Sequence, residues 1–209
     1  MAGPATNGWN RRDFFGGAAL LALALGLPVA AVHLTDLPDD EAPNDRQRQL
    51  MNRVAQLVIP RTDTPGAGDV GTGDFVLLAL AHGLSGSADP VSSGLLSRQV
   101  RHLRRDGSLR HAEWLEAELD LRAGGDFLRS PARQAALLGA LDSEAYGQGQ
   151  DRHPWRTIKT LLLTGYYTSE AGGSQELRYE LVPGRWDPDL PATPQTRAFS
   201  SDWTAVDFG

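Results

Sequence analysis

The chain has 209 residues and a formal net charge of −6. This length suits a single domain with additional chain around it, and the acidic balance does not suit a phosphate backbone, so we expect no nucleic-acid partner. Cysteine does not occur, which excludes structural disulfides, thiolate-ligated iron–sulfur clusters and covalently attached c-type haem in this chain.

The first feature along the chain is a pair of arginines in front of an apolar run. Arg11 and Arg12 precede Phe14 in the segment WNRRDFFGGAALLALALGLPVAAV. This arrangement is typical of a twin-arginine export signal, which directs folded proteins across the inner membrane. The apolar run is shorter than the roughly 20 residues that a membrane-spanning helix needs. We therefore predict a cleavable signal peptide over residues 1–31 and a periplasmic location.

An acidic, proline-containing linker is predicted next, over residues 32–44. Helical spacing follows it in NDRQRQLMNRVAQLVIP, where apolar residues recur at intervals of three and four. We expect Asn44 or Asp45 to be the N-cap of this helix and Pro60 to stop it.

Further helices are predicted as far as residue 167. The first of them is FVLLALAHG, with Asp74 as its N-cap, and two more are predicted around Leu95 to Arg105 and around Leu109 to Leu121. Another begins after Ser130, with Ser130 as N-cap and Pro131 as the first helical residue. The last runs from Pro154 through WRTIKTLLLTGYY. The sequence thus predicts a mainly α-helical fold class, with a compact helical domain over residues 45–164.

The C-terminal part, residues 165–209, differs in composition. It holds seven of the fifteen aromatic residues together with four prolines, so it cannot form one long helix, and it is too aromatic for a disordered segment. We predict an extended arm that packs on the domain and on a partner, with a short strand at QELRYELV. Candidate interface residues are Tyr166, Tyr167, Glu176, Arg178, Tyr179, Trp186 and Trp203, because arginine, tyrosine and tryptophan dominate interface hot spots. That these residues cover only the domain's own core is an equally weighted alternative.

Residue patterns for catalysis or metal binding are not found. The loop RTDTPGAGDVGTGDF fits no calcium loop, and its glycine-rich part GAGDVGTGDF fits no P-loop. We interpret Asp63, Asp69 and Asp74 as residues that bond turn amides and cap the next helix. The five histidines show no metal-ligand spacing, and no nucleophile elbow occurs. We expect no catalytic residue, cofactor site or metal site in this chain.

A group of carboxylates in the predicted fourth helix receives a structural interpretation as well. We expect them to form a solvated helix face, opposite the apolar residues Trp114, Leu115 and Leu119. The carboxylates are Glu113, Glu116, Glu118 and Asp120.

Two long motifs also carry a family resemblance. The loop IPRTDTPGAGDVGTGDF, and much later TLLLTGYYTSEAGGSQELRYELVPGRWDP, stand behind a twin-arginine leader. In this order they resemble the gluconate 2-dehydrogenase subunit 3 family, the small or gamma subunits of exported FAD-dependent sugar and gluconate dehydrogenases. The resemblance implies a chain without its own redox centre, FAD in a large partner subunit of the glucose–methanol–choline type, and haem c in a cytochrome c subunit or an iron–sulfur cluster in other subunits.

The resemblance further implies an escort role. The flavoprotein lacks a signal of its own, loads FAD in the cytoplasm, binds this subunit and crosses through the twin-arginine translocase on its leader, and the complex stays peripheral to the inner membrane. Two alternatives remain open. Residues of the arm could instead shape the substrate entrance of the flavoprotein, or the chain could be a stand-alone periplasmic sugar-binding protein. Gluconate, glucose, fructose, lactose or a glucoside oxidised at carbon three are all compatible substrates.

Overall fold

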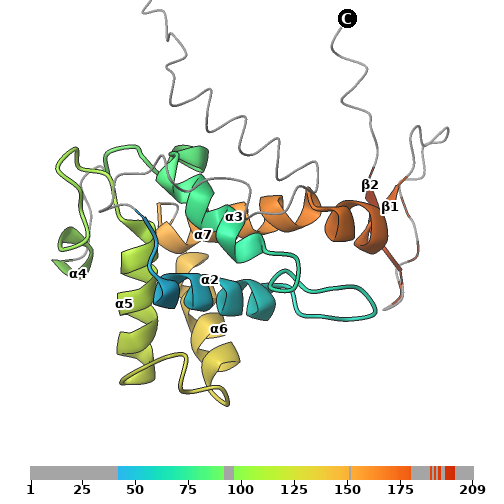
Figure 1. Cartoon of the computed structure of the whole chain (residues 1–209), viewed down its shortest axis with the longest axis horizontal. Coiled ribbons are helices and arrows are strands. Elements are labelled where there is room, and N and C mark those ends of the chain that lie inside the picture. Colours follow the sequence, from blue (N-terminus) through green and yellow to red (C-terminus); the bar gives the residue numbers. More distant parts are fainter. Residues whose placement is uncertain are drawn as a thin grey trace, which may run out of the picture.

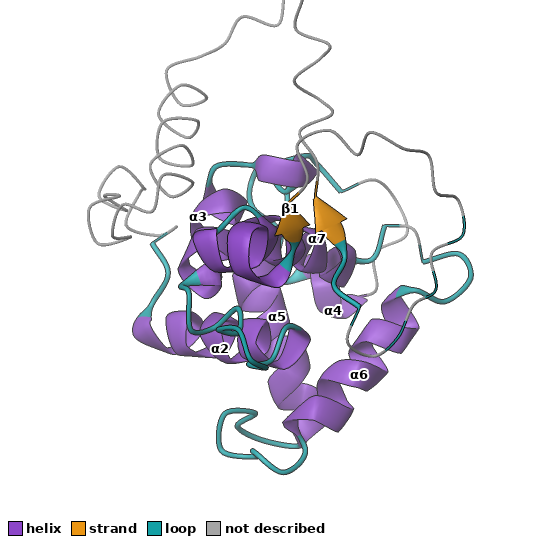
Figure 2. Ribbon diagram, turned by 90° about the vertical axis from the view of Figure 1, so that its right-hand side faces the viewer, coloured by secondary structure: helices purple, strands orange, loops and turns teal. Residues whose placement is uncertain are grey.

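The computed structural model describes residues 42–91, 97–150 and 152–179, together with residues 189, 191, 193 and 196–200. Within these ranges, helices surround one apolar core, and two strands of two residues each lie at one end (Figures 1 and 2). The mainly α-helical fold class is confirmed. The predicted signal residues Arg11, Arg12 and Phe14 lie outside the described residues, as do Trp186 and Trp203.

The first described helix, α2 (Asp45–Val58), begins and ends where its sequence predicts. The Asn44 side chain accepts a hydrogen bond from the Gln47 backbone N–H (2.8 Å), and the Gln47 side chain accepts one from the Asn44 N–H (3.1 Å), which is a complete capping box. The buried face consists of Leu50, Met51, Val54 and Ala55. This periodic apolar face directs α2 onto the core.

Helix α3 (Thr72–Ala81) packs directly on α2, and its start differs from the prediction. The N-cap is Gly71 in a left-handed conformation (φ 76°), so Asp74 lies inside the first turn and does not cap the helix. The glycine turns the chain into the helix three residues earlier than a side-chain cap at Asp74 would. A Cβ on Gly73 would lie 2.7 Å from the Asn52 backbone nitrogen. The two helix backbones therefore touch at this point.

The predicted helix around Leu95 to Arg105 is much shorter in the structure. Helix α4 covers Ser97–Val100, after the short turn η3 (Leu84–Gly86), and residues 92–96 lie outside the described ranges. After α4 the Arg104 N–H donates to the Ser108 carbonyl (2.7 Å) across a turn that Gly107 permits with φ 85°. Because this turn uses the backbone amides that a continuing helix needs, the helix stops at Val100.

Helix α5 (His111–Ala123) carries the carboxylates that were predicted to face solvent, and this prediction is wrong for three of them. Glu118 is 4% exposed and pairs with Arg122 at 2.7 Å. Glu116 and Asp120 bind the guanidinium of Arg46 on α2, with Asp120 at 2.8 Å. Periodicity within α5 could not reveal the counter-charge of Glu116 and Asp120, because Arg46 belongs to another helix, whereas Glu118 is paired four residues along α5 itself.

Asp126 completes this cluster at 3.0 Å from Arg46, so one guanidinium is surrounded by three carboxylates. We call Arg46, Glu116, Asp120 and Asp126 the Arg46 clamp. It connects the first turn of α2 to α5 and to the turn that follows α5.

Helix α6 (Gln134–Ala145) begins three residues later than predicted. Ser130 is not its N-cap, because the Ser130 hydroxyl donates to the Asp126 carbonyl (3.2 Å), and Arg133 occupies the cap position. The side-chain amide of the buried Gln134 instead donates to the Phe127 carbonyl (2.9 Å). This bond fixes the start of α6 against the preceding turn.

The last long helix, α7 (Pro154–Tyr167), confirms the prediction and passes through the centre of the fold (Figure 1). His153 caps it by accepting from the Trp155 N–H (3.2 Å), and Pro154 is the first helical residue. Gly165 leaves room for the Phe75 ring of α3. The largest fully buried side chains, Trp114, Trp155, Tyr166 and Phe127, all belong to the apolar core. Within the described ranges, no helix combines the length and apolar character of a membrane span.

Candidate subunit interface

The loop between α2 and α3, which carries the first motif, folds back on itself. The Ala67 N–H donates to the Ile59 carbonyl (3.0 Å), and the Gly68 N–H donates to the Gln56 side chain (2.9 Å). Gly68 can hold this position only as glycine, since a Cβ would lie 2.8 Å from the Asn52 carbonyl oxygen. The result is a closely packed loop rather than an open binding cradle.

Asp69 holds the turn of this loop, as the sequence predicts. Its carboxylate accepts from the Gly66 N–H (2.8 Å) and pairs with Arg61 at 2.9 Å. The hydrogen bond from Arg61, and next the one from Gly66, lower the pKa of Asp69 below its ordinary value. Asp69 is therefore ionised at neutral pH.

The second motif reaches this loop from the other end of the chain. The Tyr166 hydroxyl at the end of α7 donates to the Pro65 carbonyl (2.8 Å), and the Thr64 hydroxyl donates to the Glu176 carboxylate. Glu176 belongs to η4 (Ala171–Glu176), a π-helical turn in which Gly172 lies against the Tyr166 carbonyl with no room for a side chain. Two motifs separated by about a hundred residues of sequence thus form one structural unit.

Part of the predicted arm adds a third layer to this unit. Strand β1 (Arg178–Tyr179) runs parallel to β2 (Phe199–Ser200), with Arg178 opposite Phe199 and its guanidinium 5.2 Å from the Phe199 ring centre. The prediction of a strand at QELRYELV is wrong for Gln175 and Glu176, because these two residues belong to the helical turn η4. The Arg197 guanidinium donates to Asp63 (2.6 Å) and to the Gln175 carbonyl. This contact ties the arm to the first motif.

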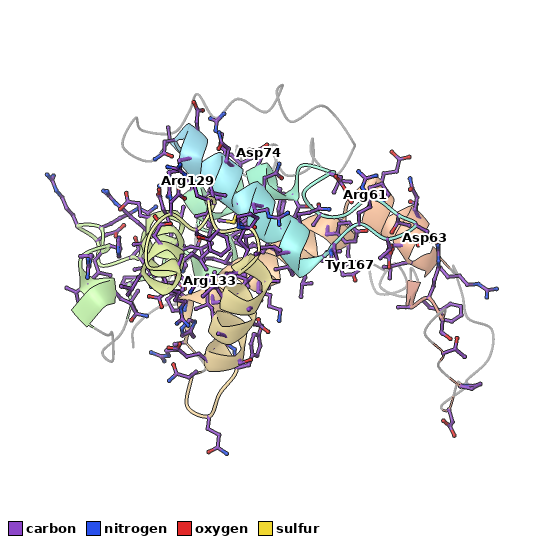
Figure 3. All side chains as sticks on the ribbon, turned by 90° about the horizontal axis from the view of Figure 1, so that it is seen from below. Arg61, Asp63, Asp74, Arg129, Arg133 and Tyr167 are labelled. Atoms are coloured by element: carbon purple, nitrogen blue, oxygen red, sulfur yellow. The ribbon has the colours of Figure 1, made fainter. Side chains whose placement is uncertain are left out.

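The outer side of this unit exposes aromatic and charged side chains. Tyr167 is 40% exposed and Phe199 is 43% exposed. Figure 3 shows Arg61, Asp63 and Tyr167 together at one end of the molecule, away from Arg129 and Arg133. We call this end the junction surface; it consists of Arg61, Asp63, Tyr167, Arg178, Arg197 and Phe199.

The seven interface candidates are distributed unequally over the structure. Tyr167 and Arg178 lie on the junction surface, and Glu176 supports it from within. Tyr166 is 1% exposed, with its ring edge-to-face against Tyr167 at 5.2 Å, so it belongs to the core of this chain. The backbone of Tyr179 forms β1. Trp186 and Trp203 lie outside the described residues.

Sequence reasoning did not select Arg61, Arg197 or Phe199. Their partners are distant in sequence, and a lone arginine in a loop carries no local pattern that marks it as an interface residue. The only available signal for Phe199 was the aromatic content of the arm, which pointed to the whole segment and not to one position.

Chemically, the junction surface is suited to recognition. It combines exposed aromatic area with planar guanidinium groups, the combination found in interface hot spots. Its ion pair between Arg197 and Asp63 is exposed to solvent and therefore adds little to stability by itself. In the part of the chain that the structure describes, no three histidine, aspartate or glutamate side chains are grouped so that they could hold a metal ion.

Comparison with known proteins agrees with the two motifs. A family model described as gluconate 2-dehydrogenase subunit 3 matches residues 45–184, which include α2, the first motif, the second motif as far as Gly184, and β1. Neither curated proteins nor solved structures gave a match. The family's name describes one subunit of a multi-subunit gluconate dehydrogenase. Since the match covers more than half of the sequence, this chain belongs to the gluconate 2-dehydrogenase subunit 3 family.

Proposed function

We propose that this chain is the non-catalytic small subunit of a periplasmic, FAD-dependent sugar or gluconate dehydrogenase, and that it escorts a signal-less flavoprotein through the twin-arginine route. Family membership supports the role of a subunit. Arg11 and Arg12 in front of an apolar run support export of a folded cargo. After export the chain remains in the complex as a structural partner.

The junction surface is the observation that carries this proposal. Two motifs that are far apart in sequence meet through Tyr166–Pro65 and Thr64–Glu176 contacts, and they leave Tyr167 and Phe199 exposed on the outside. Large exposed aromatic side chains have a lower free energy when they are buried against a partner than when they are in contact with water. A rigid, hydrogen-bonded support lowers the ordering cost when that partner binds.

The division of labour places redox chemistry in the partners. The large subunit, of the glucose–methanol–choline type, holds FAD and oxidises the sugar, and further subunits with haem c or an iron–sulfur cluster pass electrons to the respiratory chain. This chain contributes binding surface and a signal. The complex is peripheral to the inner membrane, because its attachment depends on those further subunits.

The test is a fractionation experiment in the native host. Replacing both Arg11 and Arg12 with lysine should retain this chain and the flavoprotein together in the cytoplasm, with FAD bound, while Arg105→Lys, an exposed arginine elsewhere, should leave export normal. Flavin absorbance and dye-linked sugar oxidation in each fraction provide the readout. A flavoprotein that reaches the periplasm in cells lacking this chain refutes the escort role, and a colourless monomer that binds a sugar by itself would favour a binding protein.

A further inference from the structure

A hollow between the start of α5 and the start of α7 takes no part in the function proposed above. Its volume is about 410 Å³, which lies within the range of about 300–1,000 Å³ that small-molecule sites have. Its walls come from residues 86–91 after η3, from residues 109 and 111 at the start of α5, and from residues 152–157 at the start of α7. We call it the α5–α7 hollow.

The walls of the α5–α7 hollow are held in place by contacts within the chain. The Val91 N–H donates to the Gly107 carbonyl (2.9 Å), which attaches the segment after η3 to the turn before α5. On the α7 side, the His153 ring lies edge-to-face against the buried Trp114, with 5.6 Å between the ring centres. A site with preformed walls loses less conformational entropy when it binds a ligand.

His111 presents a hydrogen-bond acceptor from these walls. Its side chain is 8% exposed, and its Nδ1 lies 3.0 Å from the Leu109 carbonyl oxygen. Because a carbonyl oxygen only accepts, Nδ1 carries the proton. Burial lowers the pKa of His111 to about 4, so the ring is neutral at neutral pH and Nε2 is an acceptor. Nε2 has no hydrogen-bond partner among the described residues, yet it is not one of their fully buried unpaired atoms, so it borders open space.

Two hollows meet the His111 ring, and their sizes differ. The second one lies toward α2 and has a volume of about 200 Å³, which is below the usual range of about 300–1,000 Å³ for ligand sites. Arg110 and Glu113 in its wall also pair with each other at 3.3 Å. The α5–α7 hollow is therefore the better place for a ligand that donates to His111.

The other polar groups of the α5–α7 hollow indicate the class of ligand. Asp89 adds a carboxylate and Thr157 a hydroxyl, and neither side chain makes a hydrogen bond or an ion pair among the described residues. Arg152 and Arg156 bring positive charge to the same walls. A simple anion would therefore meet Asp89, and a simple cation would meet two guanidinium groups. A neutral ligand with several hydroxyl groups matches this mixture, because hydroxyls both donate and accept.

We propose that the α5–α7 hollow binds a neutral, monosaccharide-sized polyol, with one hydroxyl donating to Nε2 of His111 and another to the Asp89 carboxylate. The inference goes beyond the proposed function and does not depend on it, because the site belongs to this chain alone. The hollow lies at the start of α7 and the junction surface at its end, about 20 Å away along a helix of 14 residues. A bound polyol therefore leaves the junction surface open to a partner protein.

The experiment follows the ¹⁵N resonances of the His111 ring by NMR while the purified full-length chain is titrated with glucose and, separately, with glucitol. The Nε2 resonance should shift in the direction of a hydrogen-bonded nitrogen and reach saturation with both polyols. Nδ1 should shift little, because it already donates to the Leu109 carbonyl. Inorganic phosphate and spermidine, the charged probes, should leave both resonances in place. An Nε2 resonance that does not respond to either polyol, or that responds to phosphate instead, overturns the proposal.

Two variants test the contacts by the same titration. Asp89→Ala removes an exposed acceptor and should weaken polyol binding about tenfold or more. Thr157→Trp narrows the hollow and should abolish the shift of Nε2. Thr160→Trp is its matched control, because Thr160 is exposed on the same helix and does not line the hollow; it should bind as the wild type does.

Circular dichroism and thermal melting show whether each variant folds, and Asp89→Ala alone suffices for the test if a tryptophan variant does not. Unchanged affinity in every folded variant overturns the site. The proposed function is tested separately by the flavoprotein that co-purifies from the native host. A chain that binds no polyol but carries the flavoprotein refutes the site alone, and one that binds a polyol but carries no flavoprotein refutes the proposed function alone.

Discussion

Replacing Gly73 with alanine should destabilise the chain, although alanine is the better helix former. In α3 the added Cβ would lie 2.7 Å from the backbone nitrogen and 2.8 Å from the Cα of Asn52 on α2. Backbone atoms cannot rotate away, so the two helices must separate locally. Helix propensity favours alanine by about 1 kcal/mol, whereas overpacking of this kind costs about 1–3 kcal/mol. Loosened packing of the fully buried Val76 next to the site adds to the cost, and we expect a net loss of about 1–2 kcal/mol.

The assay is urea unfolding of the full-length chain followed by circular dichroism, with Gly139→Ala as the matched control. The same substitution at Gly139 meets open space, so it should raise the free energy of unfolding by about 0.5–1 kcal/mol. For a chain of this size, each kcal/mol corresponds to a change of about 2–4 °C in Tm. If Gly73→Ala stabilises the chain as Gly139→Ala does, the close approach of α2 and α3 is wrong.

Three further predictions concern the surface, the clamp and a buried histidine. Tyr167→Ala combined with Arg178→Ala should reduce the amount of large subunit that co-purifies with this chain. Since both residues are exposed, the melting temperature should change by no more than about 2 °C. A purified complex of normal composition would count against the junction surface. Arg46→Met should lower the free energy of unfolding in urea by about 1–3 kcal/mol, because three carboxylates lose their common partner. The control Arg48→Met, on the exposed side of α2, should lower it by less than about 0.5 kcal/mol. Burial lowers the pKa of His111 to about 4, and the hydrogen bond to the Leu109 carbonyl offsets this only in part. The contribution of His111 to stability is therefore complete above the ordinary histidine pKa and is lost as the pH falls from about 6.5 to 4. His111→Asn should flatten the unfolding free energy over this pH range, and an unchanged pH profile would contradict the assignment.

Local signals in the sequence were sufficient for elements whose ends depend on their own residues. The start of α2 follows from the reciprocal bonds of Asn44 and Gln47, and the start of α7 from His153 and Pro154. Errors arose where a residue bonds outside its own element. Serine is a common N-cap residue, but the Ser130 hydroxyl donates its hydrogen bond to the Asp126 carbonyl instead of capping α6. Periodicity assigned Glu116 to a solvated face, yet Arg46 of α2 binds its carboxylate.

The junction surface shows the same limit. Composition pointed to the arm and to Tyr167 and Arg178, because residue type alone marks hot-spot chemistry. The meeting of Thr64 with Glu176, and of Asp63 with Arg197, depends on how α7 crosses the core and could not be predicted from local pattern. Tyr166 and Tyr167 are adjacent in sequence, and only the orientation of α7 decides that the first is buried and the second exposed.

The Arg46 clamp has a mechanical consequence. Arg46 lies in the first turn of the first described helix and is held by carboxylates of α5 and of the turn after it. A force applied to the chain from its N-terminal side therefore acts on this clamp before it reaches the apolar core. Threading machines that unfold substrates from that side would have to break several charge-assisted bonds at once, which makes the beginning of α2 a point of resistance to such machines rather than a place where unfolding starts.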